Sequence, residues 1–165
     1  MRKLLGILVL FLVFGACKKT EKTTAVVENA DLEFNYQKMP DKIGINPEAT
    51  AIVEKWEEFK ALNSSIDVLY KSTNNEDLAL AIDDLIEKEK NMADGEYPEL
   101  FDTFQVKSRQ RVLRTFLYKV KASILENQPT TEPTIAVLEA YNNIRRQLNV
   151  LVNSQLDKKL ILDEA

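Results

Sequence analysis

The sequence predicts an all-α protein whose folded part is an antiparallel four-helix bundle with up-down-up-down topology. Three observations favour this fold. Apolar residues recur at spacings of three and four in four separate segments, the period of an amphipathic helix. No segment alternates apolar and polar residues with the period of two of a strand, and the 165 residues include only 4 glycines. Short polar connections between the segments favour antiparallel neighbours.

The amino terminus has the composition of an export signal. Arg2 and Lys3 precede an apolar core from Leu4 to Phe14, and small residues follow it. At about 1.5 Å per residue, this core is far shorter than the roughly 30 Å hydrocarbon layer of a bilayer. We therefore expect residues 1–16 to be a cleaved signal peptide and not a spanning helix.

The end of this segment, Phe14-Gly15-Ala16-Cys17, resembles the lipobox of bacterial lipoproteins, with phenylalanine where that pattern usually has an aliphatic residue. The resemblance implies cleavage before Cys17, a lipid on its thiol and attachment to a membrane of the bacterial envelope. Cys17 is the only cysteine, so no disulfide can form within one chain. The alternative is an ordinary secretory signal followed by an incidental free thiol.

Lys18 follows the candidate lipidation site. In many lipoproteins an aspartate at this place retains the protein in the inner membrane, so lysine resembles an outer-membrane destination. We therefore expect the periplasmic face of the outer membrane.

Residues 17–46 are expected to be the lipidated cysteine and an extended tether. The first part is polar and rich in Thr, Glu and Lys, which suits a solvated linker. Residues 34–46 are more apolar and are predicted to pack on the bundle as irregular structure or a short strand-like piece. Their apolar members are Phe34, Tyr36, Met39, Ile43 and Ile45.

The helical bundle domain is expected to cover residues 47–165. Asn46 is a candidate N-cap and Pro47 suits a first helical position, so one continuous helix is predicted from 47 to about Ser72. Its apolar stripe contains Ile52, Trp56, Phe59, Ile66 and Tyr70.

A second helix is predicted from about Glu76 to Asn91. Gly95 is expected to end it in the left-handed conformation, and Pro98 cannot continue it. Its acidic residues are interpreted mainly as a solvated face.

The third helix is predicted from about Pro98 or Thr103 to Glu126, and the fourth from about Pro133 towards Leu162. Three polar residues late in the fourth helix are expected to mark its solvent side. These are Asn149, Asn153 and Gln155.

Composition excludes several kinds of chemistry. The chain has no histidine, which rules out histidine-based catalytic relays and histidine-ligated metals. We expect no catalytic residues, no metal and no cofactor. A formal charge of −4 without a dominant basic region is also unfavourable for nucleic-acid binding.

The third predicted helix is strongly basic, and two interpretations of its charge are open. Its cations can pair with the acidic second helix, where exposed pairs contribute about 0 to 1 kcal/mol each. They can also form a patch for an anionic partner such as lipid headgroups, a cell-wall glycan or an acidic protein surface. The candidate patch residues are Arg109, Arg111, Arg114, Arg145 and Arg146.

Aromatic residues offer a candidate ligand pocket between the helices. Trp56, Tyr118 and Tyr141 are the residues proposed to line it. Trp56 also fits the apolar register of the first helix, so core packing is the competing interpretation.

These features favour a non-enzymatic, membrane-tethered helical module that binds a protein, lipid or cell-wall partner. A small-ligand-binding bundle is the alternative, and a carboxylate-based hydrolase is the third hypothesis.

Overall fold

The computed structural model describes residues 34–163, with side chains described as far as Gln155. Every regular element in this range is helical, which confirms the all-α class. The elements are η1 (Tyr36–Lys38), α3 (Pro47–Val53), α4 (Glu57–Leu69), α5 (Asn75–Asp94), α6 (Phe104–Leu125) and α7 (Thr131–Asp163). The predicted signal peptide, Cys17 and the first part of the tether lie outside the described residues.

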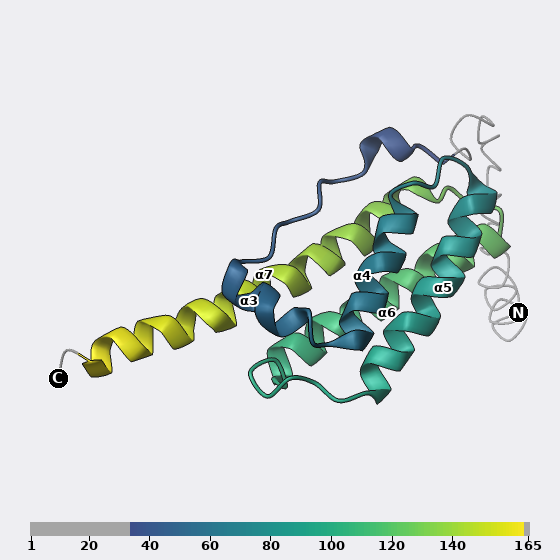
Figure 1. Ribbon diagram of the computed structural model, residues 1–165. Helices are drawn as coiled ribbons and strands as arrows, with labels where there is room; N and C mark the ends of the chain where they lie inside the picture. The colour runs from purple at the N-terminus through teal and green to yellow at the C-terminus, as the bar shows by residue number, and fades with distance from the viewer. Residues whose placement is uncertain (1–33, 164–165) are drawn as a thin grey trace, which may run out of the picture.

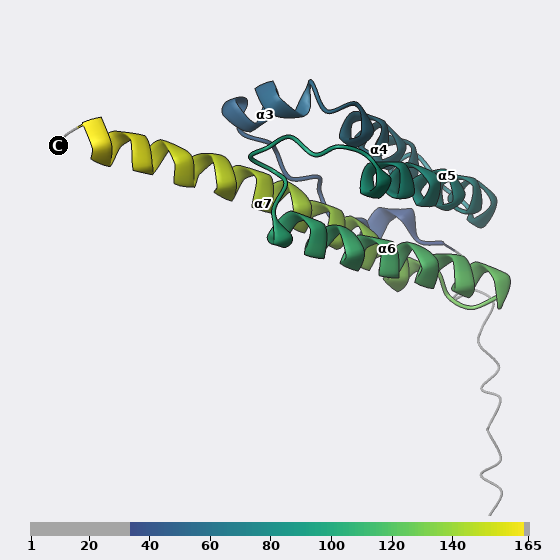
Figure 2. The ribbon, with the colours of Figure 1, turned by 90° about the horizontal axis from the view of Figure 1, so that it is seen from below.

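The four longer helices pack in chain order, α4 on α5, α5 on α6 and α6 on α7. Two layers are visible in Figure 2, with α3, α4 and α5 in one and α6 and α7 in the other. The carboxyl-terminal part of α7 projects beyond the other helices (Figure 1). Between residues 34 and 163, no helix combines the length and apolar character needed to cross a membrane.

The core lies between the layers and receives apolar side chains from every helix. Because each helix carries an apolar stripe, burying that stripe supplies most of the stability of the fold. Fully enclosed members include Phe59, Leu62, Leu85, Leu113, Leu117, Tyr141 and Leu148.

Two helix starts have the side-chain caps that their residue types favour. The Asn74 side chain accepts a hydrogen bond from the Asp77 N–H, and Thr103 accepts one from the Val106 N–H. Asn46 stands before α3 as expected, but its side chain makes no capping bond there. It donates instead to Asn153 Oδ1 at 3.0 Å.

The prediction of one continuous helix from residue 47 to 72 is wrong. α3 ends at Val53 and α4 begins at Glu57, and Trp56 between them has an extended backbone (φ −100°, ψ 90°). The α3 helix contacts α7, whereas α4 packs on α5. One straight helix cannot follow both neighbours, so the chain breaks and keeps Trp56 buried at the junction.

Gly95 follows α5 but does not adopt the expected left-handed conformation. Its backbone is extended, with φ −86° and ψ −178°. Glycine is favoured here by a close approach, because a Cβ would lie 2.9 Å from Glu58 Oε1 and 3.1 Å from the Asn91 carbonyl oxygen. Glycine is therefore favoured at this turn because it lacks a Cβ, and not because its backbone adopts a positive φ.

Residues 34–46, which we call the strap, run along α7 (Figure 1). Phe34 is buried at the start of the strap, and the Asn35 N–H donates to Thr131 Oγ1 at 2.9 Å. Further along, the Asn46 N–H donates to Asn149 Oδ1 at 2.8 Å. The strap thus follows α7 from its amino end and then leads into α3.

Four polar side chains of α7 hold the second half of the strap, and we call them the polar ladder: Asn142, Arg145, Asn149 and Asn153. The Asn142 amide accepts from the Ile43 N–H at 2.9 Å and donates to the Asp41 carbonyl at 2.8 Å. The Asn149 amide repeats this pattern with the Asn46 N–H at 2.8 Å and the Gly44 carbonyl at 3.0 Å.

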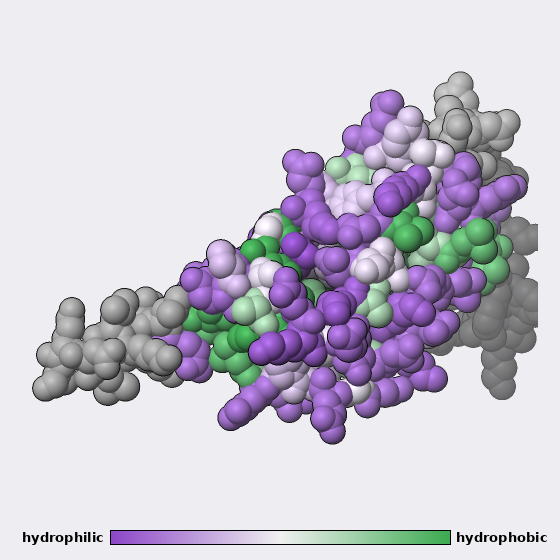
Figure 3. Space-filling model, in the orientation of Figure 1, coloured by the Kyte–Doolittle hydropathy of each residue, from purple (hydrophilic) through white to green (hydrophobic). Residues whose placement is uncertain are grey.

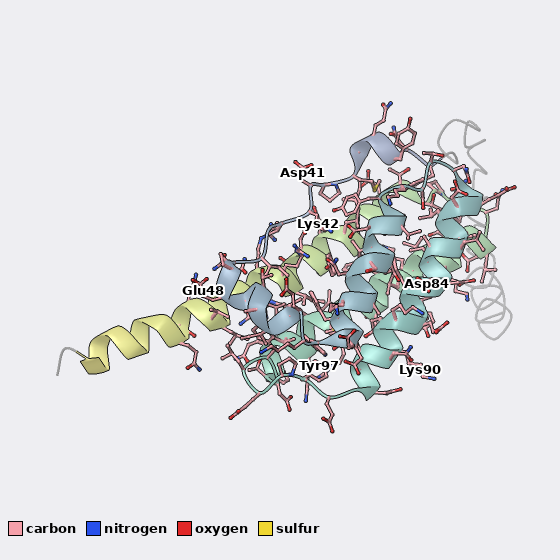
Figure 4. The ribbon with its side chains drawn as sticks, viewed as in Figure 1. Asp41, Lys42, Glu48, Asp84, Lys90 and Tyr97 are labelled. Carbon is pink, nitrogen blue, oxygen red and sulfur yellow. The ribbon has the colours of Figure 1, made fainter. Side chains whose placement is uncertain are left out.

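Each of these two amides therefore pairs with the carbonyl of one strap residue and the N–H two residues on. Figure 4 places Asp41 and Lys42 on this segment. The expectation that Asn149 and Asn153 only mark the solvent side of α7 is wrong, because both bind the strap.

Candidate functional site

The outward side of α6 carries a row of large side chains at intervals of seven residues, which we call the α6 stripe: Phe104, Arg111, Tyr118 and Leu125. Seven residues make almost two helical turns, so the four side chains lie along one side of the helix. Phe104 is 73% exposed, Tyr118 54% and Leu125 76%. The Arg111 guanidinium lies 5.8 Å from the centre of the Phe104 ring.

Smaller side chains lie one turn away from the large ones. Ser108, Thr115 and Ala122 each follow a stripe residue by four positions, and all three are at least partly exposed. Large and small side chains therefore alternate along this surface of α6. Such alternation provides ridges and hollows into which side chains of another surface can pack.

Half of the cations of α6 have a carboxylate partner. Lys107 pairs with Asp102, Arg114 with Glu89 at 2.7 Å, and Lys121 with Asp83 at 2.8 Å. These pairs match the interpretation that α6 neutralises acidic neighbours. The other three are Arg109, Arg111 and Lys119, and they form no ion pair within residues 34–155.

The five arginines of the predicted anionic-partner patch do not share one surface. Arg109, Arg111 and Arg114 are on α6, and of these Arg111 is the most open to solvent. On α7, Arg146 is exposed and donates to Asn143 Oδ1 at 2.7 Å. Adjacent residues of a helix point about 100° apart, so Arg145 does not share the exposed side of Arg146. Arg145 is only 8% exposed and belongs to the polar ladder.

A buried polar chain connects α5 and α6 behind the 95–103 turn. Glu89 is 1% exposed and accepts hydrogen bonds from Arg114 Nε at 2.7 Å and Gln110 Nε2 at 3.0 Å. The hydrogen bond to Glu89 raises the pKa of Arg114. Tyr97 donates its hydroxyl to Gln110 Oε1, and burial raises the pKa of Tyr97.

Trp56 packs beside the Tyr97 end of this chain, with ring centres 5.0 Å apart. It is 2% exposed and stacks on Phe59 at 5.3 Å. Trp56 Nε1 is the only fully enclosed side-chain nitrogen or oxygen in the described part that lacks a hydrogen-bond partner. Trp56 is therefore mainly a core residue.

Trp56 also lines a surface hollow of about 520 Å³. Neither Tyr118 nor Tyr141 contributes to it. Tyr118 is exposed on the α6 stripe, and Tyr141 is fully buried and stacks on Phe59 at 6.1 Å. The structure thus does not bring the three aromatic residues of the predicted pocket together. The hollow is lined by Ala51, Ile52, Lys55, Trp56, Glu57, Glu58, Glu96, Tyr97 and Pro98.

A separate polar cluster surrounds Arg145. Its Nε donates to the Ile43 carbonyl, and one terminal nitrogen donates to Asn63 Oδ1 at 2.9 Å and to the Tyr141 hydroxyl oxygen at 3.1 Å. Tyr141 in turn donates to Asn63 Oδ1 at 2.7 Å. Burial raises the pKa of Tyr141 to about 12, although the Arg145 charge acts in the opposite direction.

Arg145 also lines a second hollow, of about 430 Å³, between the strap, α3 and α4. Its other lining residues are Ile45, Thr50, Val53, Glu54, Phe59, Lys60, Asn63 and Ser64.

A smaller exposed apolar pair lies between α4 and α5. Val68 and Leu80 are 54% and 74% exposed and border a shallow hollow together with Asp77 and Asp84. Figure 3 shows that the visible face of the molecule is largely hydrophilic, with apolar patches separated from one another. This pair is shorter than the α6 stripe and contains no aromatic residue.

Several residues of these clusters were missed by sequence reasoning. Glu89 was grouped with the solvated acids of its helix, and Asn63 and Gln110 were not singled out. A usable pattern was present for the ladder, because its members follow one another at spacings of three, four and four. That is the spacing of a helix face, carried here by polar residues.

Among residues 34–155, no group of three or more Asp, Glu, His or Cys residues is placed to hold a metal ion. No family model, no curated protein and no solved structure matches the chain.

Proposed function

We propose that this chain is a lipid-anchored, non-enzymatic module on the periplasmic face of a bacterial outer membrane. It acts by binding a protein, lipid or cell-wall partner, and its helices form an antiparallel up-down-up-down bundle that presents one helix outward. The α6 stripe is the observation that carries this proposal. Its residues combine aromatic and apolar surface with a cation, and nothing in the described part covers them.

The composition of the stripe supports a role in contact. Exposed apolar surface that is contiguous and bordered by polar groups marks interaction sites more often than scattered apolar residues do. Tyr and Arg are also enriched among residues that dominate binding energy. Arg111 and Tyr118 are adjacent members of the stripe, so a partner with acidic and apolar groups fits it.

The place where the tether meets the bundle supports the anchored arrangement. Asn35 is bonded to Thr131, the first residue of α7, so the chain arriving from Cys17 joins the bundle at the α6–α7 turn. The strap continues along α7, away from the long outward side of α6. Within the described residues, the strap therefore does not cover the α6 stripe.

Site-specific photocrosslinking in the host cell tests the contact surface. A photoreactive phenylalanine analogue at Tyr118 should give a defined adduct, because this side chain lies in the middle of the stripe. Tyr36, which is 47% exposed on η1, is a matched control position and should give none. The Tyr118 adduct should disappear when Arg111→Glu reverses the charge of the stripe. Equal adducts at both positions, or none at Tyr118, contradict the proposal.

The anchor is tested separately with Cys17→Ala. The wild-type chain should incorporate a clickable fatty acid and fractionate with outer membranes, whereas the variant should remain uncleaved and unlabelled. Labelling of the variant, or no labelling of the wild type, overturns the anchor and leaves the contact surface to be judged by the crosslinking.

A further inference from the structure

Arg145 is a buried cation without a carboxylate partner. Its residue surface is 8% exposed, and its three hydrogen-bond partners, the Ile43 carbonyl, Asn63 Oδ1 and the Tyr141 hydroxyl, are all neutral. No ion pair of Arg145 occurs within residues 34–155. Burial of a charge is costly unless an opposite charge or a full set of hydrogen bonds compensates it.

Glu54 lines the same hollow as Arg145 but forms no ion pair with it, and the nearby Asp67 is already engaged. Asp67 forms an ion pair with Lys42 and accepts a weak hydrogen bond from Asn63 Nδ2 at 3.4 Å. It is linked to Arg145 only through the Asn63 amide, so it does not contact the guanidinium. The positive charge of Arg145 is therefore offset at a distance and not by a direct partner.

One edge of the guanidinium remains available. All Arg145 hydrogen bonds use Nε and Nη1, and Nη2 makes none with the described residues. Nη2 is therefore not fully enclosed, because Trp56 Nε1 is the single fully enclosed side-chain nitrogen or oxygen of the described residues that lacks a partner. Arg145 lines the 430 Å³ hollow, and Nη2 is its one side-chain nitrogen that makes no hydrogen bond with the described residues.

We propose that this hollow is a binding site for a small organic carboxylate, which the Arg145 guanidinium recognises. Nη2 carries two N–H groups, which can donate charge-assisted hydrogen bonds to a carboxylate. Hydrogen bonds to the Ile43 carbonyl, Asn63 and Tyr141 hold Arg145 in place before any ligand arrives, so little side-chain freedom is lost on binding. This site is independent of the α6 stripe.

The walls of the hollow suit the apolar body of such a ligand. Ile45 and Val53 supply apolar surface from the strap and α3, and Thr50 and Ser64 add hydroxyl groups, while the Phe59 ring that borders the hollow is fully buried. The volume of about 430 Å³ lies within the usual range of small-molecule sites, roughly 300 to 1,000 Å³. A bare inorganic anion would leave this apolar surface unused.

Arg145 also has a structural task, since its Nε binds the strap at Ile43. That task needs neither the hollow nor the free edge of the guanidinium. Asn142 and Asn149 already bind the strap through neutral amides at both sides of this position. A neutral side chain could serve the strap in the same way, so strap binding alone does not explain a buried charge here.

Calorimetry on the purified full-length chain tests the site with benzoate as the probe. Benzamide has the same shape without the charge, and inorganic phosphate has charge without the apolar ring. Benzoate should bind with one-to-one stoichiometry and at least about tenfold more tightly than either control. No benzoate binding, equal binding of benzamide, or equal binding of phosphate overturns the proposal.

Variants separate the charge from the hollow. Arg145→Met keeps much of the side-chain volume and should weaken benzoate binding by about tenfold or more, while Arg145→Lys should weaken it less. Benzoate binding that is unchanged in Arg145→Met contradicts the role of the guanidinium.

A third variant leaves Arg145 and the strap untouched. Ser64→Trp fills the hollow from an exposed position of α4 and should abolish benzoate binding, with a melting temperature close to that of the wild type. Ser154→Trp, at an exposed serine position on α7, is the matched control and should bind normally. Unchanged benzoate binding in Ser64→Trp contradicts the placement of the site in this hollow, even if Arg145→Met fails to fold.

Discussion

The side-chain oxygen of Asn142 accepts a hydrogen bond from the backbone N–H of Ile43 at 2.9 Å, across 99 residues of sequence. The same amide donates to the Asp41 carbonyl at 2.8 Å. One asparagine therefore satisfies two backbone groups of the strap, which has no strand or helix partner at this point. Backbone N–H and C=O groups that are shielded from water need such partners, because an unpaired polar group there costs free energy.

Asn142→Ala should lower the free energy of unfolding by about 1 to 3 kcal/mol, because it removes both hydrogen bonds of a buried amide. It should also raise the amide hydrogen-exchange rate of Ile43, which loses its acceptor. Urea denaturation and exchange measured by NMR check the two effects. Asn143→Ala is the matched control, since Asn143 is exposed on α7 and accepts a hydrogen bond from Arg146 instead of binding the strap. An equal loss in both variants would show that the Asn142 hydrogen bonds to the strap contribute nothing to stability.

Trp56→Ala should cost about 3 to 5 kcal/mol, as expected for a large core side chain. Trp56→Phe should cost clearly less than Trp56→Ala, because phenylalanine keeps much of the stacking on Phe59 and removes the enclosed N–H that has no partner. Chemical denaturation of the two variants provides the comparison. If phenylalanine is as costly as alanine, Trp56 Nε1 has an acceptor in solution.

Replacing Arg114 should lower the stability of the fold more than replacing Glu89 does. The Glu89 side chain is 1% exposed and the Arg114 side chain 40%. Arg114→Met leaves a buried carboxylate without its counter-ion and should cost about 3 kcal/mol or more, whereas Glu89→Met leaves an arginine that can reach water and should cost less.

The double variant Glu89→Met with Arg114→Met isolates the pair. Its loss of stability should be smaller than the sum of the two single losses, because neither partner is then left alone. Strict additivity in urea denaturation would mean that the two side chains act independently.

Tyr141 should make the fold sensitive to alkaline pH. Its pKa is raised by burial from 10.0 to about 12, so the folded state favours the neutral phenol. Stability from this group is fully present below pH 10 and is lost as the pH rises towards 12, where the unfolded state has already released its proton. Between pH 10 and 12, the free energy of unfolding should fall by about 3 kcal/mol because of this group.

Tyr141→Phe should remove this component of the pH dependence. It should also cost about 1 to 3 kcal/mol at neutral pH, because the hydroxyl loses its hydrogen bonds with both Asn63 and Arg145. Denaturation curves between pH 8 and 12 compare the two chains. Parallel curves for wild type and variant would show that Tyr141 ionises normally in the folded state.

The all-α class and most helix boundaries follow from the sequence alone. The predicted starts at about Glu76 and Thr103 lie within one residue of the observed starts of α5 and α6, and the buried positions of α6 and α7 follow the three-four pattern of Val106, Leu113 and Leu148. These features depend on residues within a turn or two of one another, so a local pattern contains the information. The proposed signal peptide and lipid site are likewise local patterns, although they lie outside the described residues.

Tertiary packing is responsible for the break before α4, the burial of Glu89 and the separation of Arg145 from the other candidate arginines. In each case the deciding partner is distant in the chain. Arg145 meets Ile43 across 102 residues and Asn63 across 82. A polar side chain on a helix has the same local pattern whether it faces water or a strap, and only the packing of the strap on α7 turns these residues into a ladder and a charged hollow.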